Sequence, residues 1–144
     1  NYHRVHSPIT GDLLTIKHIT GDLWPVNDYF VKIKKNLYYQ NERLIFEIKT
    51  IDNGICYVIM VGALNVGKIH TPFISNLSTN NLKTKNNLTE YKIKNNKVAL
   101  GDELGTFNLG STVIITFDSI LKKQCDFKYQ KNCQIKTGES LCNN

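Results

Sequence analysis

The segment TIDNGICYVIMVG, residues 50–62, decides the expected fold. Its second half is an apolar run rich in β-branched residues, which is typical of a buried strand. Asn53-Gly54 precedes that run, and this dipeptide is a strong short-range signal for a tight β-hairpin turn. The segment therefore predicts an antiparallel hairpin with its turn at Asn53-Gly54.

Similar short runs recur along the chain and are separated by Gly, Asn or Asp. The TGD signals at 10–12 and 20–22 and the GD signal at 101–102 have a spacing that suits a sandwich or a barrel. Residues 75–97 are rich in Asn and Lys and are expected to form an exposed loop or an irregular hairpin. We predict a mainly β single domain over residues 1–144, with strands at 13–19, 30–33, 44–49, 56–61, 66–70, 98–100 and 111–117.

The stretch SPITGDLLTIKHITGDLWPVN, residues 7–27, resembles the barrel-sandwich hybrid fold of lipoyl and biotinyl carriers and related enzymes. Such carriers present a modifiable lysine at a hairpin tip, flanked by Met or Asp-Ala. No such tripeptide occurs in this chain. The resemblance therefore supports the sandwich-like fold but not a carrier role.

The composition limits the function classes. With 144 residues, 41% hydrophobic and 21% charged, the chain fits one soluble globular domain with a real core. Its longest apolar runs, 55–63 and 113–117, are too short to span a bilayer, and no stretch has the form of a signal peptide. The net charge of +6 favours acidic partners, namely nucleic acid or an anionic membrane surface. No nucleic-acid-binding motif is present, so no nucleic acid partner is expected.

The four cysteines show no CxxC pair. Cys56 lies in an apolar run and is expected to be a small core residue. Cys125, Cys133 and Cys142 have no histidine near them in the sequence, so no metal site is expected. We expect reduced thiols, while a disulfide between two of these three remains open.

Two short motifs carry candidate chemistry. In FNLGSTVI, residues 107–114, a glycine interrupts an expected strand and Ser111 follows it. The serine is either part of a turn or a nucleophile that faces the preceding peptide bond. In HRVH, residues 3–6, His3 and His6 flank an arginine and would be unusual in a core, whereas His18 and His70 suit structural roles. In an extended segment His3 and His6 face opposite sides.

Five ordered blocks together resemble the catalytic domain of phosphatidylserine decarboxylases, and the likeness continues to KTGESL at 136–141. They are YHRVHSPITGDL at 2–13, GDLWPVN at 21–27, NER at 41–43, VGALNVGKI at 61–69 and GDELGTFNLGSTVI at 101–114.

The resemblance implies that the chain cuts its own Gly110–Ser111 bond, giving a β chain, 1–110, and an α chain, 111–144. The Ser111 hydroxyl would attack the Gly110 carbonyl and form an ester. Loss of the Ser111 Cα proton and elimination of the ester would leave dehydroalanine, and its hydrolysis would give ammonia and a pyruvoyl ketone. His6 matches the base for self-cleavage, and His3 matches the histidine that handles the proton at the substrate Cα.

The implied activity is decarboxylation of phosphatidylserine to phosphatidylethanolamine through a Schiff base with the pyruvoyl group. The expected partner is phosphatidylserine in an anionic membrane, with the protein peripheral on the cytoplasmic side of the inner membrane; a homodimer remains open. The family places the aspartate that orients His6, and a helical region, before the part that matches this chain. Asn1 stands where the family usually has aspartate, and we expect a missing upstream segment. Without the aspartate that orients His6, we expect residues 1–144 alone to fold but to cleave themselves slowly or not at all.

Three alternatives remain open from the sequence. A decarboxylase of another serine phospholipid, such as archaetidylserine, would use the same headgroup chemistry. A non-catalytic basic β module could bind anionic membrane, and Ser111 would then be only a turn residue. An inactive gene fragment would fold without turning over substrate.

Overall fold

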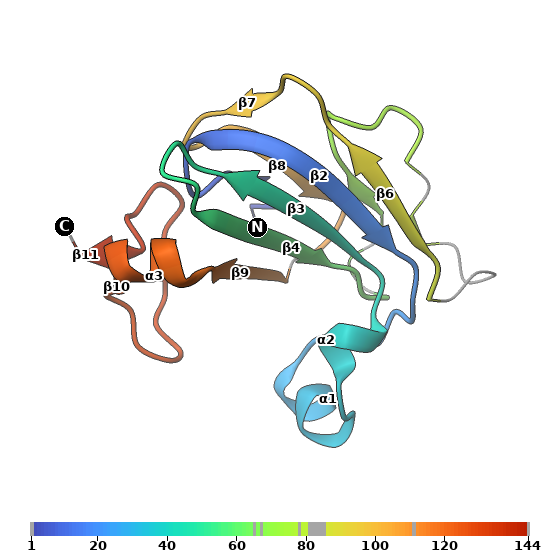
Figure 1. Ribbon diagram of the computed structural model, residues 1–144. Helices are drawn as coiled ribbons and strands as arrows, with labels where there is room; N and C mark the ends of the chain where they lie inside the picture. The colour runs from blue at the N-terminus through green and yellow to red at the C-terminus, as the bar shows by residue number, and fades with distance from the viewer. Residues whose placement is uncertain are drawn as a thin grey trace.

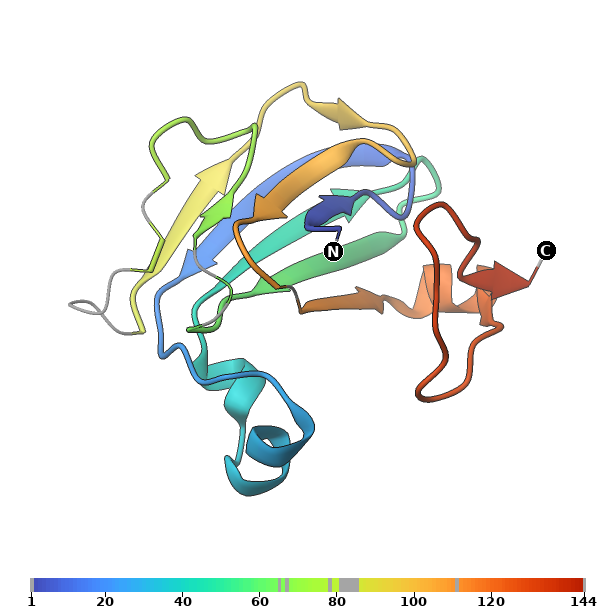
Figure 2. The same ribbon diagram turned by 180° about the vertical axis from the view of Figure 1, so that it is seen from behind.

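The computed structural model describes residues 2–64, 66, 68–77, 79–80, 86–110 and 112–143. Antiparallel strands form most of it, and two sheets lie face to face (Figures 1 and 2). The prediction of a mainly β domain is confirmed; the strands are arranged as open sheets rather than a closed barrel.

The larger sheet has the strand order β6-β2-β3-β4-β9, with β7 also pairing with β2. The predicted hairpin is confirmed, because β3 pairs antiparallel with β4 and Asn53 takes the left-handed backbone conformation at φ 63°. Buried and partly exposed residues alternate along β3, as expected for a strand with one face on a core. Its strands are β2 (Gly11–Ile19), β3 (Arg43–Lys49), β4 (Ile55–Val61), β6 (Leu88–Lys92), β7 (Lys97–Val98) and β9 (Val113–Phe117).

The smaller sheet comprises β1 (Arg4–His6), β8 (Glu103–Phe107) and β5 (Ile69–His70), in the order β1-β8-β5. Figure 2 shows this sheet in front of the larger one. The two sheets approach closely, since a Cβ added to Gly105 of β8 would lie 2.7 Å from the sulfur of Met60. Side chains of both sheets fill the core between them, among them Leu13, Ile16, Phe46, Met60, Leu104 and Phe107.

Three local expectations are wrong. Residues 30–33 are not a strand but belong to α1 (Asp28–Ile33), because the Asn27 side chain caps the helix by accepting from the Phe30 N–H. The segment 75–97 includes β6, which pairs with β2 along the sheet edge. The first TGD signal is not a turn, since Gly11 already begins β2.

The last part of the chain forms α3 (Ser119–Gln124) and a small antiparallel pair, β10 (Asp126–Phe127) with β11 (Cys142–Asn143). Asp118 caps α3 by accepting from two backbone N–H groups. Cys125 and Cys142 form a disulfide across this unit, so the expectation of reduced thiols is wrong for these two. The bond closes the ends of a loop that otherwise contributes little to the core. Cys56 is a free, buried core residue, as predicted, and Cys133 is free and exposed.

The remaining helix, α2 (Leu37–Gln40), follows α1 in the connection between β2 and β3. Both helices project from one end of the larger sheet (Figure 1). In the part of the chain that the structure describes, no helix has the length and apolar character needed to cross a membrane.

Candidate functional site

The pairing of β1 with β8 brings the HRVH motif beside the segment 101–110. Arg4 lies opposite Thr106 and Val5 opposite Gly105, and the register shifts before His6, which lies opposite Glu103. Val5 is buried in the core and so fixes β1 to the sheet. The polar side chains on either side of Val5, Arg4 and His6, contact Glu103 and the Gly101 carbonyl near the start of β8.

His3 lies against the expected scissile bond. Its backbone carbonyl accepts from the Phe107 N–H at 2.9 Å, which continues the β1–β8 pairing by one step. Its Nδ1 lies 3.2 Å from the carbonyl oxygen of Gly110. A carbonyl can only accept, so Nδ1 carries the hydrogen in this contact. Gly110 has φ 61°, a left-handed conformation that glycine adopts without the strain of a Cβ.

His6 makes two contacts through its ring. Its Nδ1 donates to the Gly101 carbonyl at 2.6 Å, and its Nε2 accepts a hydrogen bond from the hydroxyl of Tyr2. The rings of Tyr2 and His6 are also stacked, with centroids 5.6 Å apart. With the hydrogen held on Nδ1, Nε2 keeps its lone pair and can accept a proton once Tyr2 moves away.

An ion pair lies beside the two histidines. The Arg4 guanidinium donates to Glu103, whose other carboxylate oxygen accepts from the Thr106 hydroxyl at 2.8 Å. The hydrogen bond from Thr106, followed by that from Arg4, lowers the pKa of Glu103 below its ordinary value. Glu103 therefore remains ionised and supplies a negative charge close to His6 near neutral pH.

The structure brings His3 and Gly110 together, whereas Ser111, the expected nucleophile, lies outside the described residues. Sequence reasoning missed the contacts of His6 with Tyr2 and Gly101. Tyr2 lies four residues before His6 in YHRVH. In an extended segment the two rings would lie too far apart to touch, so the sequence alone did not indicate their contact.

The other two histidines lie elsewhere. His18 is buried on β2, and its Nε2 lies 2.8 Å from a carboxylate oxygen of buried Glu42, which agrees with a structural role. His70 is exposed on β5.

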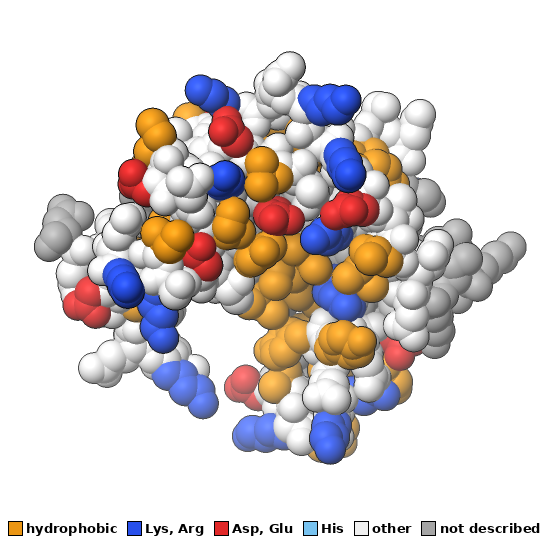
Figure 3. Space-filling model, viewed as in Figure 1, with side chains coloured by type: hydrophobic (Ala, Val, Ile, Leu, Met, Phe, Trp, Pro, Cys, Tyr) orange, Lys and Arg blue, Asp and Glu red, His pale blue; other side chains and the backbone are white. Residues whose placement is uncertain are grey.

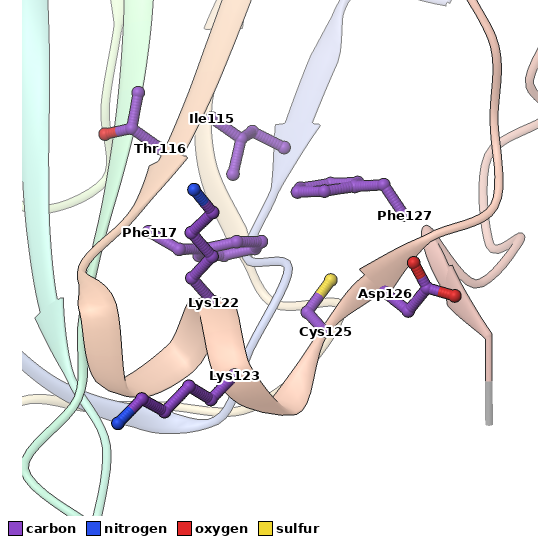
Figure 4. A pocket seen from close by; sticks show the side chains of 8 residues that line it. All are labelled: Ile115, Thr116, Phe117, Lys122, Lys123, Cys125, Asp126 and Phe127. Atoms are coloured by element: carbon purple, nitrogen blue, oxygen red, sulfur yellow. The ribbon is translucent and has the colours of Figure 1, made fainter.

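A separate pocket of about 560 Å³ lies between β9, α3 and β10 (Figure 4). Phe117 and Phe127 stack in it with ring centroids 5.5 Å apart, and the Lys122 side chain lies next to Phe117. None of its lining residues belongs to the neighbourhood of His3 and Gly110, so the pocket is not part of the candidate site.

The described residues form an open two-sheet β domain that holds the His3 imidazole at the Gly110 carbonyl. The family model described as phosphatidylserine decarboxylase matches residues 1–143. The chain belongs to the phosphatidylserine decarboxylase family.

Curated relatives agree with this family. The phosphatidylserine decarboxylase proenzyme of Helicobacter pylori (strain Shi470) is 36% identical over 143 residues, covering 98% of this chain and 51% of the relative. That of Coxiella burnetii (strain Dugway 5J108-111) is also 36% identical, covering 94% and 45%. That of Brevibacillus brevis is 38% identical over 119 residues, covering 83% and 42%. The chain thus spans about half the length of the curated relatives it matches.

Proposed function

We propose that this chain supplies the catalytic part of a phosphatidylserine decarboxylase, and that its pyruvoyl group forms by self-cleavage between Gly110 and Ser111. The observation that carries the proposal is the 3.2 Å contact between His3 Nδ1 and the Gly110 carbonyl oxygen. The family membership and the proenzyme names of the relatives support it independently.

The contact suits the first step of the cleavage. Attack by the Ser111 hydroxyl on the Gly110 carbonyl carbon moves negative charge onto the carbonyl oxygen. A hydrogen-bond donor already aimed at that oxygen stabilises the charge as it develops. His3 is our candidate for that donor, since its Nδ1 already contacts the Gly110 carbonyl oxygen.

His6 is our candidate for the base that removes the Ser111 proton. The Gly101 carbonyl holds the His6 Nδ1 hydrogen, as a carboxylate does in a serine protease triad, and so leaves the lone pair on Nε2. In this structure the Tyr2 hydroxyl donates a hydrogen bond to His6 Nε2. Tyr2 must therefore move away before Nε2 can accept a proton from Ser111.

Once formed, a pyruvoyl group supplies a ketone that binds the substrate amine and accepts the electrons released with CO₂. The chain fits this cofactor because the group would arise from its own residue 111, next to Gly110 and the His3 imidazole. His3 would orient the substrate headgroup and return a proton to its Cα. We place this reaction at an anionic membrane, with the protein peripheral on the cytoplasmic face of the inner membrane.

Intact-mass measurement tests the cleavage. We expect cleavage, slow in this chain alone, to yield 1–110 and 111–144, with a pyruvoyl group at the start of the smaller piece. Ser111→Ala should leave one intact chain, while Ser140→Ala, in the exposed C-terminal part, should cleave like the unmodified protein. Cleavage of Ser111→Ala at the same bond would contradict the nucleophile assignment. CO₂ release from phosphatidylserine, compared with archaetidylserine, then tests the substrate.

A further inference from the structure

A lobe formed by residues 24–40, which include α1 and α2, carries an unusual number of exposed large apolar side chains. Tyr29, Ile33 and Tyr39 are 66%, 60% and 72% exposed, and Trp24, Val31 and Tyr38 are each more than a third exposed. No residue of α1 is buried. Leu37, which is 2% exposed, anchors the lobe to the rest of the protein. The core does not account for these side chains, and an exposed apolar surface of this kind marks an interaction site.

The charge of the lobe indicates its partner. Residues 24–40 include three lysines, Lys32, Lys34 and Lys35, and one acidic residue, Asp28. The ammonium of Lys34 lies 4.5 Å from the centre of the Trp24 ring. Figure 3 shows orange side chains running down to the lobe, with lysines at its lower rim. Aromatic residues among lysines suit a bilayer interface, where rings lie at headgroup level and cations meet anionic lipid.

A second copy of this chain suits the lobe less well. In a symmetric dimer the same surface would face itself, and its lysines would then repel one another. An anionic lipid surface satisfies both features at once, because it neutralises the lysines and accepts the apolar side chains.

The lobe lies at the same end of the protein as the candidate site. The Leu64 N–H donates to the Leu23 carbonyl, and the Leu109 N–H donates to the Val66 carbonyl, both at 2.8 Å. These bonds connect the lobe, the loop after β4 and the segment that leads into Gly110. Leu64 and Leu109, which make these bonds, are each 63% exposed.

We propose that the lobe 24–40 docks on an anionic lipid surface, with its aromatic residues in the headgroup region and its lysines on the lipid charges. Docking through the lobe would bring Leu109 and Gly110 toward the bilayer that holds a lipid substrate.

Vesicle flotation tests the docking surface. We expect the chain to bind vesicles of phosphatidylcholine with phosphatidylglycerol, and to bind pure phosphatidylcholine far more weakly. Replacing Lys32, Lys34 and Lys35 by Gln should weaken binding more than tenfold at physiological salt, since each such lysine contributes about fivefold. Replacing Tyr29, Ile33 and Tyr39 by Ser should also reduce binding more than tenfold. These vesicles contain no phosphatidylserine, so the result does not depend on the proposed decarboxylation.

Matched variants elsewhere serve as controls. Ile51→Ser with Leu100→Ser removes side chains that are 95% and 69% exposed. Replacing Lys122, Lys123 and Lys128 by Gln removes three charges around α3 and β10, which lie apart from the lobe in Figures 1 and 2. Both controls should bind within about twofold of the unmodified chain. Control variants that lose as much binding as the lobe variants would overturn the proposal.

Trp24 gives a second readout, because it is the single tryptophan of the chain and lies in the lobe. Its emission should shift to shorter wavelength when the unmodified chain binds the anionic vesicles, and should stay unshifted with the Tyr29, Ile33 and Tyr39 variant. Bound protein with unchanged Trp24 emission would overturn the proposal. So would a native mass showing that the lobe variants convert a dimer into a monomer, since the lobe would then contact a second copy.

Discussion

His3 Nδ1 lies 3.2 Å from the Gly110 carbonyl oxygen, although 107 positions separate the two residues in the chain. The contact depends on the β1–β8 pairing, because the Phe107 N–H holds the His3 backbone beside the start of the β8–β9 connection. A residue that the family resemblance assigns to decarboxylation is therefore also in contact with the bond expected to be cut. In our proposal, His3 therefore serves both steps.

The first prediction concerns His3 in self-cleavage. His3→Ala removes the donor to the Gly110 carbonyl and should slow cleavage about 10²–10³-fold, as the loss of one oxyanion donor does in other enzymes. His3→Asn should recover part of the rate, because its amide nitrogen can take a position close to that of Nδ1. The two rates are measured from the intact mass of purified protein over time.

The outcome separates two accounts of His3. On the resemblance alone, His3→Ala should cleave at least partly and then decarboxylate poorly. If the contact with Gly110 assists cleavage, His3→Ala should slow both cleavage and decarboxylation. Cleavage of His3→Ala at the unmodified rate would show that the contact with Gly110 plays no part in cleavage.

The second prediction compares His6 with its neighbour Tyr2. His6→Ala should block cleavage, since an unassisted serine hydroxyl is a weak nucleophile. Tyr2→Phe removes the hydroxyl that occupies His6 Nε2 and should cleave at least as fast as the unmodified chain. Circular dichroism checks that both variants fold. A complete block in folded Tyr2→Phe would indicate that Tyr2 itself takes part in proton transfer.

Strands could be predicted from the sequence where the turn residues and the pattern of buried residues indicate the same structure. Asn53-Gly54 and the apolar run after it specified the β3–β4 hairpin, because the turn and the buried face demand the same register. The 30–33 strand failed because the β-branched residues of α1 are exposed, and the Asn27 cap determines the local structure there instead. β8 was missed because Gly105 weakens its strand pattern, although a Cβ at this position would lie only 2.6 Å from the backbone oxygen of His70 on β5.

The candidate site could be predicted only in part. The residues themselves stood out as motifs, and the resemblance gave their roles. Their arrangement depends on a strand pairing between opposite ends of the chain, and single-sequence patterns do not specify such pairings. The contact of His6 with the Gly101 carbonyl illustrates this. Every residue has a backbone carbonyl, so the sequence does not indicate which one His6 contacts.

The third prediction compares two carboxylates that contact β2. Glu42 is buried and accepts from His18 Nε2 at 2.8 Å and from the Asn80 N–H at 2.7 Å. Glu42→Ala would leave both donors without their acceptor and should lower the free energy of unfolding by about 3 kcal/mol. Glu90 pairs with Lys17 at 3.5 Å on the solvent-exposed side, so Glu90→Ala should cost less than about 1 kcal/mol. Urea unfolding measures the free energy of unfolding of each variant. An equal loss in Glu42→Ala and Glu90→Ala would contradict the prediction that the buried carboxylate contributes more.

The fourth prediction concerns the cysteines in the native protein. Cys133 is exposed, whereas Cys56 is buried and burial raises the pKa of its thiol to about 12. Thiol reagents attack the thiolate, so at pH 8 only Cys133 should be labelled in the folded chain. Unfolding without reductant should expose Cys56 as well, and reduction should release Cys125 and Cys142. Labelling of all four cysteines in unreduced, unfolded protein would contradict the disulfide.

The same disulfide makes a prediction about the cleaved protein. Cys125 and Cys142 both follow Gly110, so their bond lies entirely within 111–144 and does not join the two products. After self-cleavage, 1–110 and 111–144 should therefore separate on a denaturing gel without reductant, and the smaller piece should migrate more slowly once reduced. The association of the native products instead depends on β9, which pairs with β4 of the larger piece from Cys56↔Phe117 to Met60↔Val113. Products that separate only after reduction would show that a cysteine of 111–144 bonds Cys56, and would contradict the free, buried thiol of Cys56.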